Sequence, residues 1–362
     1  MNRDPILFRV DGTTQGGWER LYRCLTYAAA LQRRRRPTYF LSQLDPGHLG
    51  LAIKRAGNNW LEADSPVGAE EDLTETIQEI RRVQPAAVVV DSPNASEAYL
   101  KELLSTGVML VSFDSHAAIR FPSHLVINPL LGPGRESYEF LPGTQLLLGT
   151  RYALVRPEIR RVRPIRAMEP AQPSPTGYRA AIALGDDDPN GQVQQLLQVL
   201  LNISKLEKID LLVRNHHPAL PALQEQAEAI PHRLSVATEP SEVTARLTRC
   251  HFAIGSGSSW SIELACVGVP QLLIVQSEHH WPTAQRLEEE GAAQVLGWHE
   301  NTSANTIRTA IQNLLTEPLE RQAMMRCGRQ LIDARGPDRL VTALEVMLHP
   351  SRLAQADFMD AA

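Results

Sequence analysis

Short apolar segments recur along this chain and alternate with segments of helical periodicity. After ILFRV at 6–10, the positions Leu21, Leu25, Ala28 and Leu31 recur at helical spacing, and further apolar segments follow. A strand that is apolar along its whole length is typical of a parallel sheet covered by helices on both faces. The other strands of this first sheet are expected at TYFL (38–41), NWLEA (59–63), AAVVV (86–90), VMLVSF (108–113) and HLVIN (124–128).

The same alternation returns in the second half, after a segment that breaks it. Residues 157–177 contain five prolines and show no apolar periodicity, which is typical of a linker. The sequence predicts an α/β fold with an N-terminal domain (1–157), a proline-rich linker (158–177), a C-terminal domain (178–336) and a final helix and tail (337–362), and two such domains imply a cleft between them. The second series of strands is expected at RAAIAL (179–184), KIDLLV (208–213), LSVAT (234–238), HFAIG (251–255) and PQLLIV (270–275).

Composition excludes several classes of function. The 36 basic and 41 acidic side chains give a formal net charge of −5, so no global positive field favours nonspecific nucleic-acid binding. No apolar run approaches the roughly 18–20 residues of a membrane span, and the run near the N-terminus is too short for a signal peptide. The four cysteines lack zinc or disulfide spacing and predict buried thiols in a reducing, cytoplasmic compartment. The basic run at 33–36 is interpreted as the solvated end of a helix.

Ligands of open parallel sheets bind beyond the carboxyl ends of the strands, so the loops that follow the strands form the candidate site. The loop GSGSS at 255–259, ahead of a helical segment, is the strongest local signal. Its small residues let backbone N–H groups approach a phosphate, although Ser258 and Ser259 are also suited to capping the helix. Glu263 lies one turn beyond Ser259, where its carboxylate suits either a ribose hydroxyl or the solvent.

Three other loops carry groups that suggest a ligand. The loop DGTTQGGWER at 11–20 lacks both the GxGxxG pattern and the GK[ST] ending, which disfavours dinucleotides and ATP. Gly185 is followed by Asp186 to Asp188, which suit a helix N-terminus or a bridging Mg²⁺ but repel a diphosphate. The adjacent pairs His216-His217 and His279-His280 lack the i, i+4 spacing of a zinc site. No metal and no cofactor is therefore expected.

At these loops the chain resembles the UDP-sugar hydrolase family of pseudaminic-acid biosynthesis, the PseG/SpsG type, which is related to the glycosyltransferase MurG. The resemblance covers most of residues 5–335 and implies a GT-B-like fold, with two Rossmann-like domains facing a central cleft. It also implies a metal-independent hydrolysis in which water attacks the anomeric carbon of a UDP-linked 2,4-diacetamido-trideoxy sugar and UDP leaves. The matching stretches are ILFRVDGTTQGG…RCLTYAAAL, LLGTRYALVRPE (147–158), IALGDDDPN (182–190), AIGSGSSWSIELACVGVP (253–270) and GAAQVLGW (291–298).

The resemblance assigns the nucleotide to the C-terminal domain, and the sugar and the general base to the N-terminal domain. The nucleotide-binding residues expected on this basis and from the neighbouring loops are Gly185, Gly257, Ser258, Ser259, Glu263 and His279. Tyr152 and Arg156 match the family's YALLR-type stretch. The sugar-binding residues expected are Gln15, Gly17, Tyr152 and Arg156.

The sequence departs from the family in the loops expected to carry catalysis. Aligning on Arg23 and Cys24 puts Arg20 where the family has its general-base histidine, and a guanidinium cannot accept a proton at neutral pH. Arg20 would instead hold a phosphate or a carboxylate. Family residues are also replaced at Asp186, at Asp91-Ser92-Pro93 and at Glu278-His279-His280. The candidate catalytic residues are Asp11, Glu19, Arg20 and His280.

Three functions fit these observations. The first is a UDP-sugar hydrolase whose base is Asp11, Glu19 or His280. The second is a GT-B glycosyltransferase in which Arg20 grips a phosphate or an acidic acceptor. The third is a non-catalytic protein that binds a nucleotide sugar or a protein partner.

Overall fold

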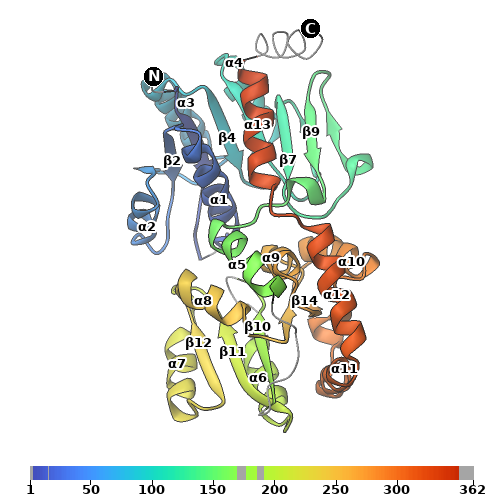
Figure 1. Ribbon diagram of the computed structural model, residues 1–362. Helices are drawn as coiled ribbons and strands as arrows, with labels where there is room; N and C mark the ends of the chain where they lie inside the picture. Colours follow the sequence, from blue (N-terminus) through green and yellow to red (C-terminus); the bar gives the residue numbers. More distant parts are fainter. Residues whose placement is uncertain (1–2, 15, 169–176, 186–190, 350–362) are drawn as a thin grey trace. The chain divides into compact units, whose positions relative to one another are not determined.

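The computed structural model describes residues 3–14, 16–168, 177–185 and 191–349 (Figure 1). They form two units, whose positions relative to one another are not determined. Unit 1 comprises the residues up to Pro129, Pro133–Leu154 and the segment from Arg335 onward, and unit 2 comprises Leu130–Gly132 and Val155–Ala334. Two of the sequence-based assignments, Gln15 and Asp186 to Asp188, lie outside the described residues.

Unit 1 contains a sheet of seven parallel strands, flanked by helices. In chain order the strands are β1 (Ile6–Val10), β2 (Thr38–Ser42), β3 (Asn59–Glu62), β4 (Ala87–Asp91), β5 (Met109–Phe113), β7 (Leu125–Asn128) and β9 (Gln145–Leu148). Two short strands, β6 (Arg120–Phe121) and β8 (Glu139–Phe140), pair separately. The α-helices of unit 1 are α1 (Glu19–Arg33), α2 (Leu49–Arg55), α3 (Glu70–Val83), α4 (Glu97–Ser105) and α13 (Gly336–Leu348).

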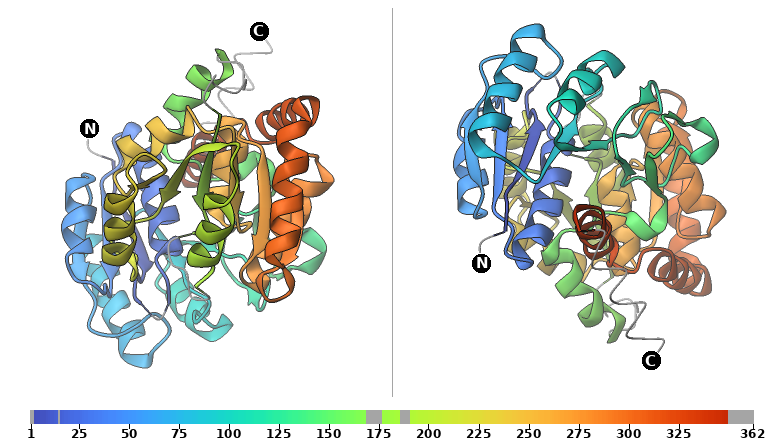
Figure 2. Two further views of the ribbon diagram at one scale, coloured as in Figure 1. Left: turned by 90° about the horizontal axis from the view of Figure 1, so that it is seen from below. Right: turned by 90° about the horizontal axis from the view of Figure 1, so that it is seen from above.

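Burial on both faces explains why the strands of unit 1 are apolar throughout. Phe8 of β1 packs in a core with residues of α1 and α13, whereas Leu7, on the opposite face of the same strand, packs with residues of α3 and α4. Helices therefore cover both faces of the sheet (Figure 2). The strands expected from the sequence in this half are all present, and β9 is an additional strand that the sequence analysis missed.

Unit 2 contains a second parallel sheet, of six strands. The strands are β10 (Tyr178–Ala183), β11 (Leu206–Leu212), β12 (Leu234–Ala237), β13 (Phe252–Gly255), β14 (Gln271–Val275) and β15 (Gln294–Trp298), the last of which was not expected. The α-helices are α5 (Pro157–Met168), α6 (Gln192–Leu201), α7 (Leu220–Ala229), α8 (Pro240–Leu247), α9 (Ser259–Val267), α10 (Trp281–Glu289), α11 (Ala304–Thr316) and α12 (Pro318–Leu331). Among the described residues, no helix is both long enough and apolar enough to cross a membrane.

The linker predicted over 158–177 is wrong where the structure describes it, because Pro157–Met168 is helix α5. Pro157 is tolerated at the first position of a helix, where its missing N–H would have no partner. The arginines that obscured the helical pattern hold α5 to the rest of unit 2. Arg163 Nη1 donates to the carbonyls of Cys266 and Ile332, each at 2.6 Å, and Arg166 Nη1 donates to that of Leu247 at 2.9 Å. These contacts of Arg163 and Arg166 with the rest of unit 2 therefore stabilise the helix, although it contains Pro164.

The interpretation of the basic run at 33–36 as a solvated helix end is also wrong in part. Arg36 is only 2% exposed, and its guanidinium binds both oxygens of Glu345 on α13, at 2.6 and 3.1 Å. Arg33 pairs with Asp338 on the same helix at 2.8 Å. The run therefore attaches the last helix to α1, and the two helices lie side by side in unit 1 (Figure 1).

Three cysteines are fully buried and free, as the sequence analysis expected for thiols of this chain: Cys24, Cys250 and Cys266. Burial raises the pKa of the Cys250 and Cys266 thiols to about 11. Both side chains therefore stay protonated near neutral pH and act as small apolar groups in the core.

Arg9 places a fully buried charge in the middle of the unit 1 sheet. Its Nε donates to Asp72 at 2.5 Å, and its other nitrogens donate to Asp11 at 2.5 Å and to the carbonyls of Leu41 and Ser65 at 3.1 and 2.7 Å. Asp72 is itself fully buried. Each of these two buried charges is thus compensated by the other.

We expect Arg9→Met to lower the unfolding free energy of unit 1 by about 3–5 kcal/mol, because Asp72 is left as an uncompensated buried charge. Asp72→Asn in the same chain should restore part of this loss, because the amide carries no charge. Urea denaturation followed by circular dichroism measures both effects. A loss below about 1 kcal/mol in the single variant would contradict the dependence of Asp72 on Arg9.

Candidate functional site

The order of the strands selects which loops meet at one edge of each sheet. In unit 2 the order is β12-β11-β10-β13-β14-β15, which reverses direction between β10 and β13. In unit 1 the corresponding reversal lies between β1 and β4. Crevices of open α/β sheets form at such a reversal, outside the carboxyl ends of the strands. The loops that begin at Gly185 and Ser256 in unit 2, and those beginning at Asp11 and Ser92 in unit 1, therefore form the candidate sites.

Packing within unit 2 requires a glycine at position 257. Its φ of +86° is a left-handed conformation that favours glycine, and a Cβ there would lie 2.6 Å from the carbonyl oxygen of His280. Its N–H donates to Ser261 Oγ at 3.0 Å. The N–H is therefore already used, and Gly257 allows the turn before α10 to approach the loop, while its assignment to the nucleotide stays a prediction.

Ser258 occupies the N-cap position of α9 but does not cap it. Its side chain makes no capping hydrogen bond, it is 2% exposed, and its Oγ has no hydrogen-bond partner among the described residues. Ser259, the first residue of α9, follows directly. A buried hydroxyl without a partner, at a helix N-terminus beyond a strand, is suited to donating to an anion.

Glu263 is held by Arg156, which the sequence analysis had placed on the sugar side. Both residues belong to unit 2. Glu263 Oε1 accepts the backbone N–H of Arg156 at 3.0 Å and its Nε at 2.9 Å, and Oε2 accepts Nη2 at 2.5 Å. The carboxylate is 7% exposed. The structure thus gives Glu263 a structural partner that uses most of its acceptor capacity, and a ribose hydroxyl would compete with Arg156 for it.

Two guanidiniums lie over the ring of Trp260, the second residue of α9. Arg156 Cζ is 4.7 Å from the ring centroid and Arg214 Cζ is 5.4 Å from it, both within the range of a cation–π interaction. Arg214 follows β11 by two residues, so it lies at the carboxyl edge of the sheet. Neither Trp260 nor Arg214 was among the residues expected from the sequence, although Arg214 directly follows the strand predicted at 208–213, whose loop was expected to belong to the candidate site.

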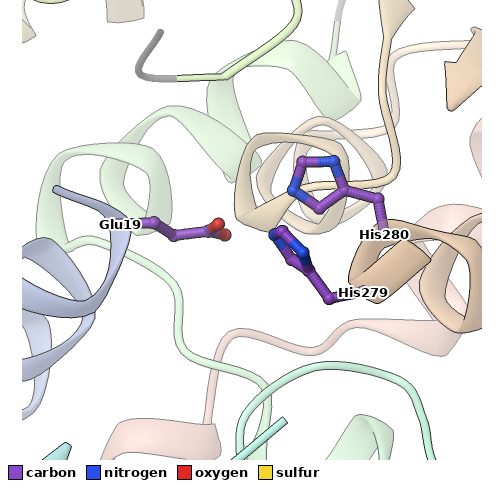
Figure 3. A group of neighbouring side chains, drawn as sticks. All are labelled: Glu19, His279 and His280. Carbon is purple, nitrogen blue, oxygen red and sulfur yellow. The ribbon is translucent and has the colours of Figure 1, made fainter. Parts of the chain in front are cut away.

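His279 and His280 end a short 3-10 turn between β14 and α10 (Figure 3). Their ring centroids are 4.3 Å apart, with the planes at 63°. His280 is buried, and its carbonyl closes over Gly257, so this turn borders the Ser258 loop. Glu19, drawn in the same figure, belongs to unit 1. Within either unit taken alone, the described residues hold no group of three His, Cys, Asp or Glu side chains placed to ligate a metal.

In unit 1, Asp11 fixes the loop after β1. Its Oδ1 accepts from Arg9 and from the backbone N–H of Gln43 at 2.9 Å, and its Oδ2 accepts the backbone N–H of Val67 at 2.8 Å. Both oxygens of this carboxylate accept hydrogen bonds, so Asp11 joins the end of β1 to the loops after β2 and β3. The geometry therefore favours a structural role for Asp11 over the catalytic role expected from the sequence.

Glu19 and Arg20 form the first turn of α1, after a loop in which Gly17 has a φ of +73°. Arg20 Nη1 donates to the carbonyl of Gly16 at 2.9 Å. Burial and the positive charge of the nearby Arg23 lower the pKa of Arg20 below its ordinary value. The side chain is therefore a partly desolvated cation whose charge is not fully balanced, which suits it to an anionic group.

Arg23 and Asp91 form a buried ion pair that the sequence analysis did not anticipate. Arg23 Nε donates to Oδ2 of Asp91 at 2.6 Å and Nη2 donates to Oδ1 at 2.5 Å, while Asp91 is 1% exposed. The pair joins α1 to the end of β4. Two arginines one turn apart on α1 thus have different contacts, because Arg23 binds a buried carboxylate through Nε and Nη2 whereas Arg20 donates to the carbonyl of Gly16.

The remaining expected residues are separated by the division into units. Tyr152 lies in a 3-10 turn (Thr150–Tyr152) of unit 1 and packs against its core, whereas Arg156 belongs to unit 2. Gly185 ends the described part of the loop after β10, with a φ of +143°. His217 is buried, and its Nδ1 accepts the backbone N–H of Ala219 at 3.2 Å, which gives it a role in the turn after β11.

Comparisons with known proteins agree with this architecture. No protein-family model matches the chain. The chain is 22% identical over 340 residues to the spore coat polysaccharide biosynthesis protein SpsG of Bacillus subtilis strain 168, an alignment that covers 92% of this chain and 96% of SpsG. This alignment confirms the sequence resemblance to SpsG at 22% identity.

Solved structures share the fold at low identity. MurG of Acinetobacter baumannii superposes with a TM-score of 0.63 at 12% identity, over 94% of this chain and 99% of MurG. The spinosyn rhamnosyltransferase SpnG in complex with spinosyn aglycone gives 0.66 at 14% identity, again over 94% and 99%. The UDP-GlcNAc 2-epimerase of Neisseria meningitidis bound to UDP-GlcNAc gives 0.61 at 10%, over 94% and 99%. The predicted fold class, GT-B-like with two Rossmann-like domains, is confirmed.

We expect Ser258→Ala to leave the unfolding free energy of unit 2 unchanged or to raise it, because the hydroxyl removed is buried and makes no hydrogen bond. Ser303 is the matched control, since it caps α11 by accepting the N–H of Thr306 at 3.1 Å. Ser303→Ala should cost about 1 kcal/mol. Chemical denaturation of the two variants tests the difference, and an equal loss in both would show that Ser258 caps α9 after all.

Proposed function

We propose that this chain binds a nucleoside diphosphate sugar at the carboxyl edge of the unit 2 sheet and hydrolyses it, releasing the nucleoside diphosphate, in the synthesis of a surface polysaccharide. The observation that carries the proposal is the N-terminus of α9, where the cap position holds the buried hydroxyl of Ser258 without a partner. Backbone N–H groups and the helix dipole at such an end favour a phosphate.

The side chains around this helix end support an anionic ligand. Arg214 and Arg156 lie over the ring of Trp260, one residue into α9 from Ser259. Arg156 is neutralised by Glu263. We assign the guanidinium of Arg214 to the diphosphate, because it lies at the carboxyl edge of the sheet beside the first turn of α9 and is able to grip a phosphate through two donors at once. Glu263 is assigned to holding Arg156 in place.

The relatives support the class of substrate. SpsG is named for spore coat polysaccharide biosynthesis, SpnG has been solved with thymidine diphosphate, and the Neisseria epimerase has been solved with UDP-GlcNAc. UDP is the nucleotide we favour, because the family resemblance of the sequence is to UDP-sugar hydrolases. The fold alone is compatible with several reactions on a nucleotide sugar.

Glycosyl transfer is the second candidate, and Arg20 is the observation that favours it. A partly desolvated guanidinium on the first turn of α1 suits a phosphate or carboxylate on an acceptor. Transfer differs from hydrolysis only in the nucleophile, which is an acceptor hydroxyl in place of water. Several of the structural neighbours are rhamnosyl- or forosaminyltransferases by name.

We expect calorimetric titration to show binding of UDP that is independent of Mg²⁺ and is weakened about tenfold or more by Ser258→Ala. A hydrogen bond to a charged group contributes about 1.5–3 kcal/mol, and 1.4 kcal/mol corresponds to a factor of ten. Ser303→Ala is the control and should bind as the wild type does. Parallel titration with dTDP tests the choice of base.

Turnover separates the two reactions. Release of UDP from a UDP-linked acetamido sugar without an acceptor supports hydrolysis, and release that requires an added acceptor supports transfer. Binding of UDP without release under either condition would leave a nucleotide-sugar-binding protein without catalysis. Absence of UDP and dTDP binding by the wild type would overturn the proposal.

A further inference from the structure

Unit 1 contains a surface pocket at the amino edge of its sheet, the edge opposite to the loops after β1 and β4. Helix α1 connects two parallel strands, so it returns from the carboxyl edge and ends at the amino edge. The pocket is lined by Arg3, which precedes β1, by Arg34, which follows α1, and by residues at the end of α13. Its volume is about 270 Å³, the space of roughly nine water molecules. The pocket therefore suits a small molecule.

The carboxylate of Glu345, which lines the pocket, is already paired. Arg36 binds both of its oxygens, and Arg3 Nη1 lies 3.0 Å from Oε1. Partial burial raises the pKa of Glu345, but Arg36 and Arg3 lower it, and the net result is a pKa below the ordinary value. Glu345 is therefore a charged carboxylate held between two guanidiniums, with two positive charges against its one negative charge.

Arg34 adds a further positive charge at the pocket. Its guanidinium has no hydrogen-bond or ion-pair partner among the described residues, whereas Arg33 and Arg36 of the same basic run are paired with Asp338 and Glu345. A cation at this position also complements the partial negative charge at the end of α1, but that interaction does not occupy the donors of the guanidinium. Arg34 is therefore able to bind an anion through two donors at once.

Two valines give the pocket an apolar wall. Val341 and Val346 of α13 both line it. A phosphate ion alone would leave part of the 270 Å³ unfilled, and a short hydrocarbon group in that part would bury apolar surface against the valines. The lining thus suits a molecule that carries an anionic group at one end and a small apolar group at the other.

We propose that this pocket binds a phosphate monoester of a small organic molecule. The phosphate is held by Arg34, with Arg3 and the imidazole of His349 beside it, and the organic group lies on Val341 and Val346. A phosphate monoester carries about two negative charges at neutral pH, which matches the surplus of three arginines over one glutamate at the pocket. All of these residues belong to unit 1, so the site is independent of the nucleotide site proposed in unit 2.

The test titrates the full-length protein with monobutyl phosphate and follows the ligand by phosphorus NMR. Arg34→Gln should weaken binding about tenfold or more, because it removes charged hydrogen bonds to the phosphate. Arg34→Lys keeps the charge but loses the planar fork, so it should weaken binding less. Inorganic phosphate should bind more weakly than monobutyl phosphate, because it lacks the group that packs on the valines.

Arg35→Gln is the matched control. Arg35 is an exposed residue of the same basic run and lies outside the lining of the pocket, so its loss changes the net charge equally without removing a ligand. This variant should bind monobutyl phosphate as the wild type does. Thr342→Glu is a second test, because Thr342 is exposed and lines the pocket, and a carboxylate there should abolish binding. Glutamate is a good helix former, so circular dichroism should show α13 intact.

Ser258→Ala separates this pocket from the nucleotide site of unit 2, and it should leave the affinity for monobutyl phosphate unchanged. An affinity that depends on Ser258 and not on Arg34 would place the phosphate in unit 2 and overturn the inference. An equal loss of affinity in Arg34→Gln and Arg35→Gln would show a general effect of charge and overturn it as well. So would the absence of monobutyl phosphate binding by the wild type. None of these results decides whether unit 2 binds UDP.

Discussion

Burial of parallel strands on both faces is the constraint on which the rest of this structure depends. A parallel strand needs a crossover connection, and an apolar strand needs cover on each side, so most crossovers contain a helix that packs on the sheet, whereas those from β5 to β7 and from β7 to β9 contain no α-helix. All strands then end at the same edge. Because the order of both sheets reverses between the first and fourth strands, the loops at Ser92 and Asp11 in unit 1, and those at Gly185 and Ser256 in unit 2, meet at the reversal.

Arginine supplies much of the polar structure in both units. Arg9, Arg23 and Arg36 bind buried or partly buried carboxylates, whereas Arg163 and Arg166 bind backbone carbonyls at the ends of neighbouring elements. The guanidinium suits both tasks, because its donors are arranged in a planar fork and its charge is weakly hydrated. A basic residue in this chain is therefore not by itself a sign of an anion site, because several of them belong to the scaffold.

The sequence predicted the strands well because their signal comes from burial, which the fold imposes uniformly along each strand. It failed for α5, whose stability comes from contacts of Arg163 and Arg166 that no local pattern displays. The Ser258 loop was predicted from its small residues. The pairing of Arg156 with Glu263 could not be predicted, because it joins positions 107 residues apart and only the three-dimensional structure brings them together.

The attachment of α13 to α1 has a consequence for how the chain is made. Leu340, Val341 and Leu344 of α13 belong to the same core as Phe8 and Leu21. A nascent chain therefore emerges from the ribosome with one side of the first core uncovered until residues 340–344 have been synthesised. Unit 2, which is continuous apart from Leu130–Gly132, is completed earlier. Domains generally fold as units during synthesis, so the second unit to be encoded is the first that has all of its residues available to fold.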